Sequence, residues 1–269
     1  MSADPRAVES ILAFWAEAGV DACLLDEPVD RLEEGAARLK ARATPPAPRL
    51  APPPSPLGAP VIDVSAAIAQ AKQAAAAAND LDALAAAIAA FDGCPLKFEG
   101  AKQAVFARGE PTAPLMIIGE GPGAEEDARG QPFVGRAGQL LDRMLAAAGL
   151  EGRVFITNTV FWRPPGNRTP SLQEQAICAP FLERAIQLVK PKMLLLAGGA
   201  AAKSVLGREE GILSLHGRWF EWHGSDGTVL PALPTLHPAF LLRQPGAKKK
   251  AWQDLLTLTE RLDRPGRPD

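Results

Sequence analysis

Short polar clusters carry the residue types that could do chemistry in this chain, and a glycine loop comes first. Glu120 follows an apolar run and precedes Gly121, Pro122 and Gly123. Glycines let a backbone approach a ligand closely, and Glu120 stands where a cleft at the end of a sheet would open. The loop lacks the spacing of phosphate-binding glycine loops, and its acids disfavour a phosphate. We expect the three acids at 125–127 to be solvated at a helix start.

An aromatic and an amide side chain occupy the next two clusters. Phe133 lies in the stretch QPFVG, where it is either a core residue or a platform on which a flat ring stacks. Asn158 ends the apolar run VFITN. Its side chain offers one acceptor and two donors, which suits reading the edge of an amide or a nucleobase.

Two arginines flank a rigid proline–glycine turn after Asn158. The stretch WRPPGNR places Arg163 before that turn and Asn167 with Arg168 after it. Arginines in such a loop can contact phosphates in a bidentate manner, and simple solvent exposure is the alternative.

A histidine and an apolar–basic loop form the last cluster. His237 follows an apolar run, and Pro238 fixes the chain direction after it, although a lone histidine is often structural. Leu241, Leu242 and Arg243 follow, with a lysine run behind them. Apolar residues beside basic ones suit a wedge that enters a nucleic-acid duplex.

Strands and helices that position these clusters alternate from about residue 91. Strands are expected at 104–106, 115–118, 154–157, 193–197 and 230–235, and helices at 137–148, 171–188, 200–205 and 248–261. Ser171 and Glu174 have the spacing of a capping box. The continuous apolar runs suit strands buried on both faces. We therefore expect an α/β fold, an open sandwich built from βαβ units.

A helical N-terminal extension precedes this region. Residues 1–42 show helical periodicity, 43–60 form a proline-rich linker, and 61–90 form an alanine-rich helix. Asp80 and Asp82 indicate a helix restart after Asn79. Residues 263–269 form a short C-terminal tail. The extension carries no readable function.

Composition limits the classes of function. A net charge of −2 weighs against a purely electrostatic nucleic-acid binder, although basic side chains exceed acidic ones between residues 152 and 260. The three cysteines are widely spaced, which disfavours a disulfide scaffold. The N-terminus lacks a signal-peptide pattern and no apolar run is long enough to span a bilayer, so we expect a cytoplasmic protein with no membrane partner.

Together the four clusters resemble the family 4 uracil-DNA glycosylases of the uracil-DNA glycosylase superfamily. The similarity covers a domain at roughly 91–262 and rests on GEGPGAEEDARGQPFVGRAGQLLDRML, ITNTVFWRPPGNRTP, AGGAAAKSVLG and HPAFLLRQPGAKKKAWQDL, which occur in that order. It implies a three-layer α/β/α sandwich with a central four-stranded parallel sheet, and the removal of uracil from DNA after base flipping.

The same resemblance implies a role for each motif residue. Glu120 is the catalytic acid, which faces a sugar that becomes cationic, and His237 is the second catalytic residue, a donor to uracil O2. Phe133 stacks on the uracil and Asn158 reads its edge, while Gly121, Pro122 and Gly123 line the pocket. The implied DNA contacts are Arg163, Asn167, Arg168, Leu241, Leu242 and Arg243.

The cysteine pattern departs from the family. Its members typically hold a [4Fe–4S] cluster on four cysteines, whereas only Cys94 and Cys178 stand at matching positions here. Phe91 and Trp162 replace the other two. Because two thiolates cannot complete such a cluster, we expect no metal and no cofactor, with the two aromatic residues filling the cluster's volume.

We therefore expect a monofunctional uracil-DNA glycosylase that leaves an abasic site. Alternatives are a glycosylase for other deaminated bases and a catalytically inactive DNA-binding relative. The intact Glu120, Asn158 and His237 disfavour the inactive relative. The expected partner is uracil-containing DNA, single- or double-stranded, and the expected state is a monomer.

Overall fold

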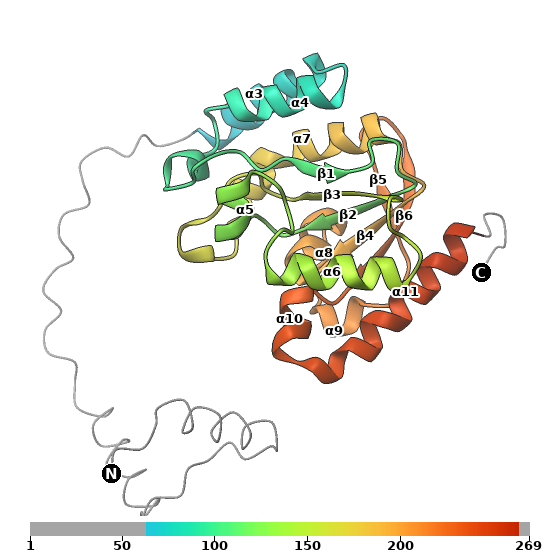
Figure 1. The fold of residues 1–269 in the computed structure, drawn as a ribbon. Helices are drawn as coiled ribbons and strands as arrows, with labels where there is room; N and C mark the ends of the chain where they lie inside the picture. Colours follow the sequence, from blue (N-terminus) through green and yellow to red (C-terminus); the bar gives the residue numbers. More distant parts are fainter. Residues whose placement is uncertain (1–62, 264–269) are drawn as a thin grey trace, which may run out of the picture. The chain divides into compact units, whose positions relative to one another are not determined.

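The computed structural model describes residues 63–263, which are drawn in colour in Figure 1. The expected segments 1–42 and 43–60 lie outside these residues, as does nearly all of the tail at 263–269. Within the described part, one sheet lies between two layers of helices. No helix in residues 63–263 is long and apolar enough to cross a bilayer.

Six strands form the sheet in the order β1-β3-β2-β4-β6-β5. The central four are parallel to one another, and β1 and β5 pair antiparallel at the two edges. The strands are β1 (Ala107–Gly109), β2 (Leu115–Gly119), β3 (Val154–Asn158), β4 (Met193–Ala197), β5 (Phe220–His223) and β6 (Val229–Thr235). The expected four-stranded parallel sheet is thus the centre of a larger mixed sheet. The strand expected at 104–106 is found three residues later, and β5 was not expected.

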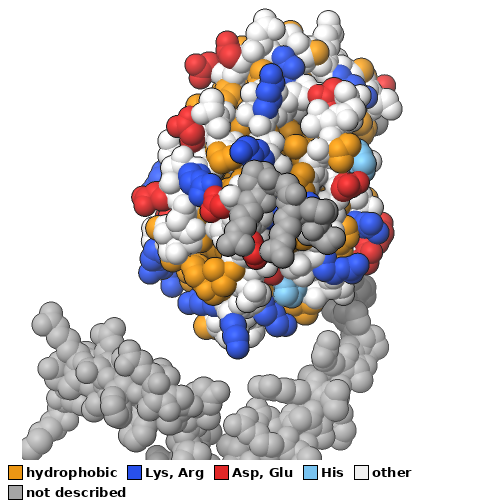
Figure 2. Space-filling view, turned by 90° about the vertical axis from the view of Figure 1, so that its right-hand side faces the viewer, with side chains coloured by type: hydrophobic (Ala, Val, Ile, Leu, Met, Phe, Trp, Pro, Cys, Tyr) orange, Lys and Arg blue, Asp and Glu red, His pale blue; other side chains and the backbone are white. Residues whose placement is uncertain are grey.

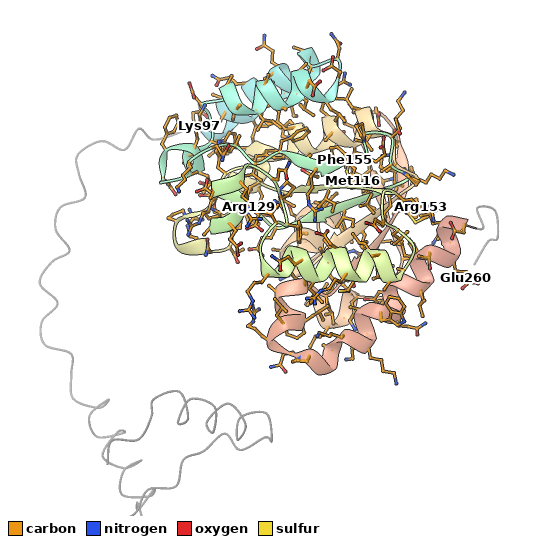
Figure 3. The ribbon with its side chains drawn as sticks, in the orientation of Figure 1. Lys97, Met116, Arg129, Arg153, Phe155 and Glu260 are labelled. Carbon is orange, nitrogen blue, oxygen red and sulfur yellow. The ribbon has the colours of Figure 1, made fainter. Side chains whose placement is uncertain are left out.

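The helices divide between the two faces of the sheet (Figure 1). Met116 and Ile118 point into the core shared with α3, α4 and α7, whereas Leu115 and Ile117 point into the core shared with α6 and α11. Met116 of β2 lies in register beside Phe155 of β3 (Figure 3). The helices from α5 onward are α5 (Ala124–Arg129), α6 (Arg136–Ala147), α7 (Leu172–Val189), α8 (Gly199–Leu206), α9 (Ile212–Leu215), α10 (Pro238–Arg243) and α11 (Lys248–Asp263), with 3₁₀ turns η1 (Pro95–Phe98), η2 (Pro165–Asn167) and η3 (Pro245–Ala247).

The helical segment expected at 61–90 consists of α3 (Val64–Ala77) and α4 (Leu81–Ala90), and the restart expected after Asn79 is confirmed. The chain restarts at Asp80, whose carboxylate accepts the Ala83 N–H at 2.7 Å and so caps α4.

The predicted capping box of α7 is confirmed. The Ser171 hydroxyl accepts the Glu174 N–H at 3.2 Å, and the Glu174 carboxylate accepts the Ser171 N–H at 2.7 Å.

All four parallel strands end at the same edge of the sheet. In Figure 3, Arg129, the last residue of the helix α5 that follows β2, lies at one end of the molecule, and Arg153, which precedes β3, lies at the other. The loops that carry Glu120 and Asn158 therefore open at the end where Arg129 lies. Ligands of open α/β sheets bind at this edge.

Candidate functional site

Side chains that follow three of the parallel strands converge at this edge. Glu120 follows β2, Asn158 ends β3 and His237 follows β6. Together with Phe133 they line one cavity of about 530 Å³. The structure therefore brings together the four residues to which the family resemblance assigns catalysis, stacking and base reading.

Gly119, the last residue of β2, allows the ring and the amide to approach the strand end. A Cβ atom at this position would lie 2.6 Å from the Phe133 ring and closer still to Asn158 Oδ1. Such distances are far below van der Waals contact. The absence of a side chain at Gly119 is thus a condition for the shape of the cavity, which sequence reasoning did not anticipate.

Phe133 is held in an unusual backbone conformation. Its φ angle is 54°, in the left-handed region that costs a non-glycine residue roughly 1–2 kcal/mol. Its carbonyl accepts from Arg108 at 3.1 Å, and the backbone of α6 approaches so closely at Gly138 that a Cβ there would overlap it. The ring is buried and its centroid lies 5.7 Å from that of His237. Both rings thus form one wall of the cavity.

Asn158 is buried with its amide unpaired. Only 1% of the residue is exposed, and neither Oδ1 nor Nδ2 has a hydrogen-bond partner among residues 63–263. Leaving a buried amide unsatisfied costs about 1–3 kcal/mol. An acceptor and a donor, side by side, are therefore available to a ligand in the cavity.

His237 is a neutral imidazole with an assigned tautomer. Burial lowers its pKa to about 4, and the nearby Arg243 contributes to the same shift. The Ala239 N–H donates to Nδ1 at 3.1 Å, so Nδ1 is the acceptor and the ring proton resides on Nε2. His237 can therefore donate one hydrogen bond from Nε2 without carrying charge.

The Glu120 carboxylate has no donor among the described residues, whereas its backbone is fixed. Thr159 Oγ1 donates to the Glu120 carbonyl at 2.6 Å, and the Thr159 N–H donates to the Gly119 carbonyl at 2.9 Å. These two bonds tie the glycine loop to the chain after β3. The carboxylate is half-buried and lines the cavity, where it can face a developing positive charge.

Glu126 links two walls of the cavity, contrary to the expectation that it is solvated. Its carboxylate accepts the N–H groups of Gly123 at 3.1 Å, Val134 at 3.0 Å and Gly135 at 2.8 Å. One side chain thereby joins the glycine loop to the loop that carries Phe133. The spacing from Gly123 to Glu126 is that of a helix N-cap and its third residue, which is the signal sequence reasoning missed.

Asp127 also departs from that expectation. It is only 1% exposed and accepts the Lys102 N–H at 2.8 Å. Of the three acids, only Glu125 is exposed as expected, 3.7 Å from Arg129.

The arginine loop lies at the cavity mouth. Arg168 and Asn167 line the cavity, and Arg163 Nε donates to Asn167 Oδ1 at 2.7 Å. Arg168 makes a bidentate pair with Glu174 at 2.8 and 2.7 Å and also reaches Glu99 at 3.2 Å. The ion pair keeps the Glu174 pKa below its usual value. Arg168 therefore anchors the loop as well as facing the cavity.

The apolar–basic loop differs in part from the expected wedge. Leu241 is fully buried against Leu140, Leu236 and Ala251, so its side chain does not protrude. Leu242 is half-buried, and Arg243 is exposed and lines the cavity. Leu241 was expected to protrude from its place in an apolar–basic stretch and from the family resemblance, whereas the six-residue helix α10 turns it inward.

A larger hollow of about 820 Å³ runs along the edge strand β5, with Arg208, Phe220 and Arg261 in its lining. It contains none of the site residues named from the sequence. Figure 2 turns the β5 side of the molecule toward the viewer, and basic and acidic side chains are interspersed there. Such a mixture lacks the single-sign field of a nucleic-acid surface, so the cavity at the strand ends is the better candidate.

Comparisons with known proteins match this arrangement to a family. Residues 106–256 match the model of the uracil DNA glycosylase superfamily. A type-4 uracil-DNA glycosylase of Pyrobaculum aerophilum is 40% identical over 170 residues, 61% of this chain and 85% of that protein. Those of Thermotoga maritima and Sulfurisphaera tokodaii are 38% and 37% identical and cover 56% and 58% of this chain, and 77% and 74% of their own lengths.

The relatives correct one expectation. Type-4 uracil-DNA glycosylases are iron–sulfur enzymes, so the prediction that there is no cofactor is contradicted. The residues described here nevertheless do not fit a cluster held by four thiolates. No group of three or more potential metal ligands occurs in residues 63–263.

The two matching cysteines lie together in the core. Cys94 and Cys178 are fully buried with their sulfur atoms 3.9 Å apart. The contact with Cys94, together with burial, raises the pKa of Cys178. Phe91 and Trp162, at the other two positions, belong to the same hydrophobic cluster.

Proposed function

The chain belongs to the uracil-DNA glycosylase superfamily, and from that premise we propose that it is a DNA repair enzyme that removes uracil from DNA. It hydrolyses the N-glycosidic bond of a flipped nucleotide and leaves an abasic site without cutting the strand. The observation that carries this proposal is the buried, unpaired amide of Asn158. A ligand that bonds to both of its polar atoms removes the penalty of leaving them unsatisfied.

Uracil offers the complementary edge. Its N3–H donates to Asn158 Oδ1, and its O4 accepts from Nδ2. The face of the base stacks on the Phe133 ring, which is buried beside the amide. The backbone of residues 121–123 closes around the base and its sugar.

Cleavage of the glycosidic bond develops positive charge on the sugar and negative charge on uracil. The Glu120 carboxylate stabilises the sugar cation and orients the water that adds to it. His237 donates from Nε2 to uracil O2, where negative charge grows. A preorganised donor of this kind contributes about 3–4 kcal/mol in other enzymes. The neutral state of His237 keeps its donor in place without a charge that must be neutralised.

DNA binding follows from the groups at the cavity mouth. The target nucleotide leaves the base stack to reach Asn158, and its neighbouring phosphates contact Asn167, Arg168 and Arg243, a proposal supported by their position in the cavity lining. The substrate is uracil-containing DNA, single- or double-stranded, and the enzyme acts as a monomer. It works in the cytoplasm, the compartment expected from the sequence.

An oligonucleotide assay tests the proposal. Purified protein is incubated with matched oligonucleotides that contain uracil, hypoxanthine or xanthine, and abasic sites are then cleaved with alkali. We expect product from the uracil substrate, and a loss of at least 100-fold (about 3 kcal/mol) when Glu120 is replaced by alanine. Product from the hypoxanthine or xanthine oligonucleotide alone would mean that the enzyme is specific for another deaminated base. No product from any of the three oligonucleotides would support an inactive DNA-binding relative.

A further inference from the structure

Two exposed apolar side chains stand at the end of the sheet where the cavity opens. Phe98 ends η1 and is 67% exposed, and Leu172 is the first residue of α7 and is 83% exposed. Among residues 63–263 they are the two most exposed large apolar side chains. We refer to Phe98 and Leu172 as the apolar rim.

Hydrogen bonds connect the apolar rim to the cavity mouth. Arg168, which lines the cavity, contacts Glu99 and Glu174 with the same guanidinium nitrogen, at 3.2 and 2.7 Å. Phe98 is adjacent to Glu99, and Leu172 lies two residues before Glu174. Both rim residues are therefore held on the side of the mouth where Arg168 lies.

The ribbon agrees with this placement. Lys97, the neighbour of Phe98, lies at the same end of the molecule as Arg129, where the parallel strands end (Figure 3). Lys97 itself is fixed by Asp92 and by the Ala89 carbonyl, both at 2.7 Å. The turn that presents Phe98 is thus anchored to the core rather than free.

We propose that the apolar rim binds an unpaired nucleobase next to the flipped uracil, so that the site makes additional contacts with single-stranded DNA. The proposal rests on the proposed function, because it takes the cavity as the uracil site. An aromatic ring stacks on any base, and such stacking is worth about 1–3 kcal/mol per base. Arg168 beside the rim is already paired with Glu99 and Glu174, so the rim contributes stacking rather than positive charge.

Pairing decides which form of DNA uses the rim. In a duplex, a base next to the flipped uracil stays paired with its partner strand inside the helix, so it cannot swing out to a side chain at the rim. In a single strand, the neighbouring base is unpaired and can turn its face toward Phe98 and Leu172. Because Arg168 both lines the cavity and bonds to the residue next to Phe98, the rim is within reach of a base that neighbours the uracil.

Two measurements on the same variants test the proposal. Binding of a uracil-free, fluorescein-labelled oligonucleotide, single-stranded and duplex, is followed by anisotropy, and uracil release is measured on the matching uracil substrates. The variants are Phe98→Ala, Leu172→Ser and Phe98→Trp. Leu256→Ser is the control, since Leu256 is an exposed apolar residue on α11, away from the mouth.

We expect Phe98→Ala to weaken binding of single-stranded DNA about 10-fold and to raise the KM for single-stranded uracil DNA by the same factor. The binding constant and the KM for duplex DNA should change less than twofold, and kcat should not change. Leu172→Ser acts in the same direction, Phe98→Trp restores binding, and Leu256→Ser changes neither. Equal effects of these substitutions on single-stranded and duplex DNA would overturn the proposal. No effect on either form would also overturn it and would favour a protein as the binding partner of the rim. Wild-type uracil release reports separately on the proposed function, because the binding measurement contains no uracil.

Discussion

The main-chain N–H of Ala239 donates to Nδ1 of His237 at 3.1 Å, and this one bond determines how the histidine can act. It occupies the nitrogen that would otherwise take up a proton. Burial lowers the pKa of the ring to about 4. His237 is therefore a neutral Nε2–H donor throughout the physiological range of pH.

The pH dependence of catalysis follows from this state of His237. We expect single-turnover uracil release to change little between pH 7 and pH 5 on account of His237, and to fall only as the pH approaches about 4. The measurement is a rate profile on a single-stranded uracil oligonucleotide. A decline centred on pH 6.5, the ordinary pKa of histidine, would contradict the assigned neutral donor.

Stability supplies an independent check on the same group. The folded pKa of His237 lies below its unfolded value of 6.5, so the unfolded chain binds the proton first. The contribution of this group to stability is present above pH 6.5 and is lost as the pH falls toward 4. Glutamine does not titrate, so the unfolding free energy of His237→Gln lacks this pH-dependent loss. The difference in unfolding free energy between wild type and variant should therefore shrink as the pH falls from 6.5 toward 4.

Asn158→Leu is expected to raise the stability of the fold while it lowers the rate of uracil release. Leucine has a similar volume and needs no hydrogen bonds, so the variant no longer carries the penalty of a buried, unpaired amide. We expect the unfolding free energy to rise by up to about 1–3 kcal/mol. Uracil release should fall at least 100-fold, because uracil N3–H and O4 lose their partners.

Chemical denaturation and the oligonucleotide assay measure the two effects of Asn158→Leu. Ile156, fully buried on the same strand, offers a control, since Ile156→Ala removes packing and is expected to destabilise the fold. A large loss of stability in Asn158→Leu would mean that the amide has structural partners and is not held for a ligand.

The sequence predicted the central sheet well because its signals are local. Apolar runs such as LMIIG and MLLLA are buried along their whole length, as a strand covered on both faces must be. The edge strand β5 escaped prediction because FEWH alternates between half-buried and exposed positions over only four residues. The break in the alanine-rich segment was predictable because aspartate is a favoured N-cap, and Asp80 does cap α4.

The sequence predicted the site residues that line the cavity better than those that only hold its loops in place through bonds to main-chain N–H groups. Glu120, Asn158 and His237 stand at or directly after the ends of strands, and these ends converge at one edge of the sheet. Phe133 lies in the loop between α5 and α6, and the family resemblance rather than a strand end singled it out as the stacking ring. Glu126 bonds to N–H groups up to nine residues away, and such loop contacts have no periodic signal. Leu241 points inward for a tertiary reason, its packing against α6 and α11.

Glu126 is expected to support catalysis by holding two loops together. Glu126→Ala removes the acceptor for three N–H groups, so the glycine loop and the Phe133 loop lose their shared anchor. We expect kcat to fall about 10-fold or more, since hydrogen bonds to a charged group contribute about 1.5–3 kcal/mol. Steady-state kinetics on uracil-containing DNA measures the effect.

Glu125→Ala is the matched control for Glu126→Ala. Glu125 is the adjacent residue, carries the same charge and makes only an exposed contact with Arg129 at 3.7 Å. If both variants lose activity equally, the loss comes from the charge of the segment rather than from the hydrogen bonds that Glu126 accepts.

Arg168→Leu is expected to reduce stability in a pH-dependent manner. Glu174 is 4% exposed, and its bidentate partner Arg168 keeps the Glu174 pKa below its usual value. Removing Arg168 leaves a buried carboxylate without its counterion at pH 7. Because Arg168 is itself partly exposed to water, we expect a loss of about 1–2 kcal/mol, at the lower end for a charged pair.

The sign of the pH effect identifies Glu174 as its source. A carboxyl group whose folded pKa is lowered contributes stability above its unfolded pKa, near 4.5, and that contribution is lost as the pH falls through the folded pKa. The gap in unfolding free energy between wild type and Arg168→Leu should therefore shrink below pH 4.5. Arg163→Leu in the same loop loses a contact to the neutral Asn167, so its gap should stay constant. A gap for Arg168→Leu that does not change with pH would show that the arginine stabilises the loop by packing rather than by its charge.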